Sequence, residues 1–183
     1  NAATGTREYA VPVVPFEEAI EDILNRHPAV REGWEATRDY YLEGGFAIAR
    51  SSTQEVTEHV QGQIRQAMQG GQTGQDAITG ILRKLRGQDD ERWTFGGSYA
   101  ETVYRTNVAS SYTRGRLEQA RDPVFRRQVA AWEFRNYPGP NVRPNHAAMS
   151  GVVAATDDPI WKTMAPPLGY NCRCSIEFVS FKE

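Results

Sequence analysis

The chain contains few lysines, few cysteines and no long apolar stretch. Lysine occurs only at positions 84, 162 and 182 among 183 residues, and there are two cysteines. A formal net charge of −2 provides no global positive field for holding nucleic acid by its phosphates. No apolar run is long enough to span a bilayer. The composition therefore argues against a membrane-spanning protein and a strongly basic nucleic-acid binder, while a local arginine patch remains possible.

The sequence also lacks a secretion signal and a plausible disulfide. The apolar stretch Ala10–Val14 is interrupted by Pro12, and no positively charged segment of the usual layout precedes it. Cys172 and Cys174 are separated only by Arg173, so a bridge between them would close almost no loop and add little stability. We therefore expect the chain to fold in a reducing, cytoplasmic compartment.

What is present is ordinary for a folded domain, with 39% hydrophobic and 24% charged residues. Apolar residues recur at helical spacing through the first two-thirds of the chain. We expect one helix after Pro15 and a second from about 34 to 49, across Gly44 and Gly45. A third should begin at a capping box formed by Ser52 and Glu55, and a fourth should follow the apolar stripe Ala77–Leu85. A fifth should run from a second capping box, at Ser98 and Glu101, to about Gln119.

The pattern changes after Pro123. Val129–Phe134 is rich in residues that favour strands, and Ser175–Phe181 alternates in polarity, so both are predicted strands. The segment Asn136–Pro144 is rich in Pro, Gly and Asn and predicts a loop. The predicted fold class is α+β, with a helical N-terminal region over residues 1–97 and a compact C-terminal module over residues 98–183. This module would contain a long helix and a small antiparallel sheet.

Four polar blocks in the last part of the chain stand out. They are the helical segment Tyr104–Asn107 continuing to Arg116, then Val142–His146, Asp157–Trp161 and Pro166–Cys174. Each block alone has a structural explanation, such as an exposed helix face, a turn or a pair of small buried thiols.

Together, their order and spacing resemble the C-terminal sequence pattern of the phage Mu F-like family of minor head proteins. The family pattern is supplied here by Arg105-Thr106-Asn107, Arg143-Pro144-Asn145-His146, Gly151, Asp157-Asp158-Pro159-Ile160-Trp161 and Pro166 through Cys174. Pro15–Ile20 and Gly45–Ala49 resemble earlier family segments more loosely. Gly44-Gly45 departs from the pattern, which has a His or Arg before this block.

The resemblance implies a phage or prophage minor head protein, a capsid component that acts in head morphogenesis at or near the portal. The resemblance also implies a role in DNA packaging or ejection. The implied partners are the phage portal, scaffold or capsid protein, with proximity to phage DNA but no specific binding and no membrane. The implied locations are the virion and, during assembly, the host bacterial cytoplasm. A toxin-delivery role is a weaker alternative, and no appended effector is visible before Glu183.

The polar blocks supply a candidate cluster that would lock the irregular loops between residues 136 and 171 onto the sheet. Its predicted members are Arg105, Asn107, Arg143, His146, Asp158, Trp161, Asn171 and Arg173. Asn171 and Arg173 flank the first cysteine of the pattern.

His146, Cys172 and Cys174 form the only soft ligand set of the C-terminal module, so zinc is the possible cofactor. Asp158 or a water would complete four ligands. We favour a second hypothesis, because structural zinc sites usually have two ligand pairs. In it, His146 bonds a backbone carbonyl or Asp158, and both thiols stay unliganded.

A third hypothesis is enzymatic. Cys172 or Cys174 could be a nucleophile with His146 as base and Asp158 orienting it, which are the residue types needed for acyl transfer. A metal-dependent enzyme using His146 and both cysteines is the related alternative. A structural role is preferred over either, because a Cys-x-Cys beside a Pro-Pro turn serves readily as a structural tie.

Overall fold

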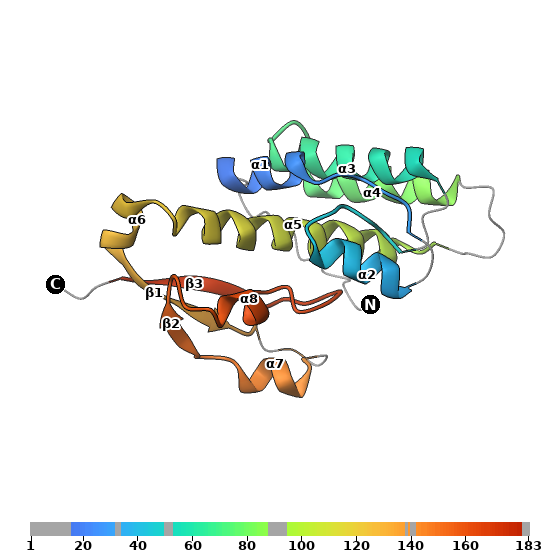
Figure 1. Cartoon of the computed structure of the whole chain (residues 1–183). Coiled ribbons are helices and arrows are strands. Elements are labelled where there is room, and N and C mark those ends of the chain that lie inside the picture. Colours follow the sequence, from blue (N-terminus) through green and yellow to red (C-terminus); the bar gives the residue numbers. More distant parts are fainter. Residues whose placement is uncertain are drawn as a thin grey trace, which may run out of the picture.

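The chain folds into a layer of helices, one long central helix and a small sheet (Figure 1). The computed structural model describes residues 16–31, 34–49, 53–87, 95–137, 139 and 142–180. Helix α5 runs across the middle, with α1, α3 and α4 on one side and the sheet on the other. This arrangement confirms the predicted α+β class. Within the described residues, no helix combines the length and the apolar character needed to cross a membrane.

Five of the helices that precede the sheet lie close to the predicted positions. They are α1 (Glu17–Asn25), α2 (Trp34–Leu42), α3 (Gln54–Met68), α4 (Gly74–Arg86) and α5 (Gly97–Gln119). The short helix α6 (Pro123–Gln128) was not predicted. A capping box that the sequence analysis did not identify opens α4. The Thr73 hydroxyl accepts from the Asp76 amide at 3.1 Å, and the Asp76 carboxylate accepts from the Thr73 amide at 3.2 Å.

The two predicted capping boxes do not open their helices. At the start of α3, Thr53 is the capping residue, and its hydroxyl accepts from the Val56 amide at 3.2 Å. The predicted cap, Ser52, lies outside the described residues. Helix α5 begins after Gly96 without a side-chain cap, so the Ser98 capping box was wrong. Ser98 is already inside the first turn of the helix, where its backbone is helical and not that of a capping residue.

Helix α2 ends at Leu42, so the prediction of a helix continuing to residue 49 was wrong. Gly44 has a φ of 97°, in the left-handed region, and its amide bonds the Tyr41 carbonyl at 3.1 Å. A glycine with this geometry stops a helix. The chain then extends so that Phe46 pairs with Pro28 in a parallel bridge, and the Phe46 side chain is fully buried.

One hydrophobic core fills the space between the helices. Its buried members come from α1, α3, α4, α5 and the segments between them: Ala19, Ile23, Phe46, Ile48, Val56, Val60, Ile64, Met68, Ile81, Leu85, Phe95, Ala100 and Val103. Most of these residues recur at helical spacing, and this apolar periodicity in the sequence predicted the buried faces of the helices.

Helices α1 and α5 approach each other closely at Gly115. A Cβ atom at this glycine would lie 2.7 Å from the Ala19 backbone nitrogen and 3.0 Å from ring atoms of Phe16. Carbon atoms normally sit about 3.5–4.0 Å from their neighbours. Glycine is therefore the residue that lets the two helices pack at this distance.

The sheet has the strand order β2-β1-β3 and is antiparallel throughout. Its strands are β1 (Val129–Arg135), β2 (Val153–Ala155) and β3 (Ser175–Ser180). On the central strand, Trp132 lies opposite Ala154 on one side and Phe178 on the other. The predicted strands at β1 and β3 are confirmed, and β2 was not predicted because three residues are too short to show alternation.

A second core lies at the sheet, and segments that look like loops in the sequence supply part of it. Its buried members are Ala120, Trp132, Phe134, Trp161, Cys172, Cys174 and Ile176. Two short helices, α7 (Pro144–Ala148) and α8 (Trp161–Met164), lie in this irregular region. Helix α5 contributes to both cores. The division of the chain at residues 97 and 98 stays a prediction.

Candidate functional site

The first candidate side chain, His146, is held inside the module by α7. Pro144 occupies the first turn of this short helix, where its lack of an amide proton costs nothing, and the Ala147 amide bonds the Arg143 carbonyl at 3.0 Å. The His146 side chain turns inward and the residue is 4% exposed. The imidazole is thus placed by a helix that the sequence pattern did not reveal.

The two cysteines lie on the segment that leads into β3. Asn171 has a φ of 59°, a left-handed conformation that asparagine tolerates, and the Cys172 amide bonds the Gly169 carbonyl at 3.2 Å. The turn delivers Cys172 and Cys174 to the same side of the chain, as expected for residues two apart in an extended segment. Both thiols are free and the two residues are buried.

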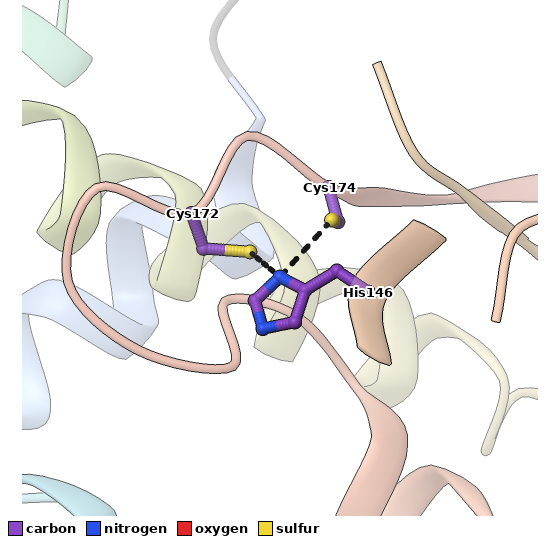
Figure 2. A group of neighbouring side chains, drawn as sticks. All are labelled: His146, Cys172 and Cys174. Carbon is purple, nitrogen blue, oxygen red and sulfur yellow. Dashed lines mark hydrogen bonds between the residues drawn. The ribbon is translucent and has the colours of Figure 1, made fainter. Parts of the chain in front are cut away.

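The imidazole Nδ1 faces both sulfur atoms (Figure 2). It lies 3.6 Å from the Cys172 Sγ and 3.7 Å from the Cys174 Sγ. The three possible ligand atoms all lie within 4.8 Å of one another. The sequence-predicted set of His146, Cys172 and Cys174 is therefore brought together in space by two segments that are 26 residues apart.

Burial sets the protonation states expected of this group when no ion is bound. Burial and the neighbouring Cys172 raise the pKa of the Cys174 thiol to about 12. Burial, with a smaller contribution from the positive charge of Arg143, lowers the pKa of His146. At neutral pH the ion-free site then holds a neutral imidazole and a protonated Cys174, so Cys174 is not the thiolate that nucleophilic catalysis needs.

Several other predicted residues hold the surrounding loops. The Arg143 guanidinium donates to the Tyr170 carbonyl at 3.0 Å, which ties the start of α7 to the turn before the cysteines. The Asn171 amide donates to the Thr106 hydroxyl of α5 at 3.2 Å. The Trp161 indole donates to the Ala155 carbonyl at 2.8 Å. These bonds connect the irregular segments to one another, to α5 and to β2.

The remaining predicted residues have other partners or are exposed. On α5, Arg105 pairs with Glu101 at 3.2 Å, and the buried Asn107 donates to the Val103 carbonyl at 2.9 Å. Arg173 is exposed.

Asp158 was predicted as a partner of His146 or as a fourth metal ligand, and the structure corrects this. Its exposed carboxylate accepts from the Ile160 amide at 2.8 Å, in the turn before α8. Among the described residues, the group of ligand atoms consists of the imidazole and the two thiols alone. An Asp followed closely by Pro favours such a local turn, and here the turn occupies the side chain.

Two polar residues of the site were missed by sequence reasoning. Asn136 follows β1, and its side-chain oxygen lies 3.8 Å from the Cys174 Sγ. Thr106 receives the Asn171 amide, although only its neighbours Arg105 and Asn107 had been selected. Asn136 lies two residues beyond the predicted strand Val129–Phe134, and this position was the one available indication.

Comparison with known proteins places these residues in a recognised family. Residues 58–177 match the family described as phage Mu protein F like protein. The chain is 28% identical over 149 residues to the Mu-like prophage FluMu F protein of Haemophilus influenzae, covering 74% of this chain and 34% of that protein. It is 23% identical over 149 residues to a protein of Escherichia phage Mu that is named putative capsid assembly protein F. That match also covers 74% of this chain and 34% of the relative.

The chain thus spans about a third of the length of these two curated relatives. No solved structure matches it significantly. The family match begins within α3 and ends within β3, so it includes His146 and both cysteines together with much of the helical layer.

Proposed function

The chain belongs to the phage Mu F-like protein family, and from this premise we propose that it acts in the assembly of a bacteriophage head. The observation that carries the proposal is the family match over residues 58–177, which is continuous from α3 to β3. The name of the phage Mu relative, which concerns capsid assembly, supports the same role. The two relatives extend well beyond the region they share with this chain, so the proposal concerns this region's part in the process.

More specifically, we propose a minor head protein that joins the growing capsid at or near the portal and acts there in DNA packaging or ejection. Its partner would be the portal, scaffold or capsid protein of the same phage. The chain would be found in the virion and, during assembly, in the cytoplasm of the host bacterium. The formal net charge of −2 fits a protein that lies near packaged DNA without gripping it.

The enzymatic alternative finds no support in the site. Cys172 and Cys174 are 5% and 6% exposed, which leaves little room for a substrate at either sulfur. The raised pKa of Cys174 keeps that thiol protonated at neutral pH, and Asp158 does not orient His146. A nucleophile–base–orienter arrangement needs all three roles in contact.

Chemical cross-linking of cells that produce the phage tests the assembly role. Two of the chain's three lysines lie among the described residues, and they report on different parts. Lys84 lies on α4 of the helical layer, and Lys162 lies on α8 near the sheet. An amine-reactive cross-linker followed by mass spectrometry should join one or both to a portal, scaffold or capsid subunit. The lysine that reacts then identifies the docking part of the chain.

The matched controls are Lys84→Arg and Lys162→Arg, which keep the charge and remove the reactive amine. Each should abolish the cross-links from its own position and leave the others. The absence of every head protein from the partners of both lysines, in samples where other head proteins are cross-linked to one another, would contradict the proposal.

A further inference from the structure

The arrangement of the imidazole and the two thiols goes beyond the assembly role and is independent of it. We propose that His146, Cys172 and Cys174 bind one zinc ion, with Nδ1 and the two sulfurs as ligands.

The distances fit a tetrahedral ion. With zinc–sulfur bonds of about 2.3 Å and zinc–nitrogen bonds of about 2.0–2.1 Å, the edge between a nitrogen and a sulfur ligand is about 3.6 Å. The observed separations from Nδ1 to the two sulfurs are 3.6 and 3.7 Å. Both nitrogen–sulfur separations therefore match tetrahedral spacing, and all three ligand atoms lie within 4.8 Å of one another.

Hydrogen bonding explains this geometry less well. In a neutral imidazole with its proton on Nε2, Nδ1 offers a single lone pair. Two thiols lie at almost equal distances from that lone pair, so at most one can make a well-directed bond to it. The other acceptor of the Cys174 thiol is the Asn136 side-chain oxygen, at the longer distance of 3.8 Å. A disulfide bond between the two sulfurs does not explain the geometry either, because both cysteines are free. A shared ion gives all three atoms a partner at once.

The ligand types favour a soft or borderline metal ion such as zinc. Two thiolates and an imidazole form a soft set that suits zinc, whereas magnesium and calcium require oxygen ligands. Binding releases the protons of the two thiols to solvent, and two thiolates then balance the charge of the divalent ion. This balance matters because the three residues are 4–6% exposed. The Asn136 oxygen, 3.8 Å from the Cys174 Sγ, is the group we assign to the fourth position, directly or through one water.

The consequence is a tie between α7 and the start of β3. The chain between His146 and Cys172 includes β2, α8 and the turns around them, and much of it is irregular. The Arg143–Tyr170 and Asn171–Thr106 bonds secure its end from the outside. A zinc ion bound to His146 at one end of this segment and to the two cysteines at the other would hold both ends in place. Structural zinc contributes directly to folding in this way.

The test measures metal in the full chain, purified under reducing conditions in zinc-containing buffer without chelators. Elemental analysis should find one zinc per chain. Replacement by Co²⁺ should give the sulfur-to-cobalt charge-transfer absorption that reports thiolate ligation. A wild-type protein with far less than one zinc per chain and no such absorption overturns the proposal, and neither measurement depends on a variant.

Variants then assign the ligands. Cys174→Ser and His146→Gln should bind Co²⁺ roughly tenfold more weakly or worse. The matched control is His59→Gln, at an exposed histidine of α3, which should keep one ion per chain. Circular dichroism checks that each variant is folded. A folded Cys174→Ser or His146→Gln protein that binds Co²⁺ with wild-type affinity and absorption refutes the assignment.

Discussion

Two glycine-to-alanine substitutions should change stability in opposite directions. Both glycines lie inside helices, Gly115 in α5 and Gly62 in α3, so in both cases alanine improves helix propensity by about 1 kcal/mol. At Gly62 a Cβ atom would meet nothing within 4 Å. At Gly115 it would meet the Ala19 backbone nitrogen at 2.7 Å and the Phe16 ring at 3.0 Å.

The Gly115 contact involves backbone, so α1 itself must move away from α5. Overpacking of this kind costs about 1–3 kcal/mol. The gain in helix propensity cancels this cost only at the lower end of that range. Because the contact is with backbone at 2.7 Å, we place the cost in the upper part of that range, at about 2–3 kcal/mol. After the gain of about 1 kcal/mol in propensity, Gly115→Ala should lower the free energy of unfolding by about 1–2 kcal/mol. Gly62→Ala should raise it by about 0.5–1 kcal/mol.

For a chain of this size, each 1 kcal/mol shifts the melting temperature by roughly 2–4 °C. Thermal and urea unfolding followed by circular dichroism measure both variants. The reasoning fails if Gly115→Ala is as stable as the wild type, or more stable, while Gly62→Ala shows its expected gain. That pair of results would mean that α1 does not approach α5 as closely as the structure has it.

Three further predictions concern a cap, an indole and the imidazole–thiol group. Thr73→Ala should lower the free energy of unfolding in urea by about 1 kcal/mol, because it removes the capping box of α4. Ser98→Ala should change it by less than about 0.5 kcal/mol, because Ser98 caps no helix. Equal losses in the two variants would contradict the assigned caps. Trp161→Phe should cost about 1–2 kcal/mol, because it removes the bond to the Ala155 carbonyl and part of a buried side chain, and an unchanged urea midpoint would argue against that contact. His146→Ala and Cys172→Ser should both lower the melting temperature, and unchanged melting in both would show that this group does not hold the module together.

The helices were largely predictable from the sequence, because apolar residues at helical spacing report which face is buried. Ile23, Val60, Ile64 and Ile81 are such residues, and all are fully buried in the core. The ends were less predictable. The termination of α2 depends on the left-handed conformation of Gly44, and the start of α3 on Thr53 in place of its neighbour Ser52.

The C-terminal module was predictable in its two longer strands and in its cysteine–histidine set, but not in its loops. Strand β2 and helices α7 and α8 are three to five residues long, too short to show a period. Their positions depend on contacts distant in sequence, such as the bond from Asn171 to Thr106. Asp158 shows the same limit, because a local turn and a distant imidazole compete for one carboxylate, and only the structure shows that the turn prevails.

Disruption of this chain in the phage that encodes it tests the assembly role most directly. Electron microscopy and DNA measurement of the particles released from producing cells would count the finished heads. We expect few complete heads, or malformed ones, with normal numbers restored when the intact chain is supplied from a plasmid. A normal yield of complete, DNA-filled heads without the chain would contradict it.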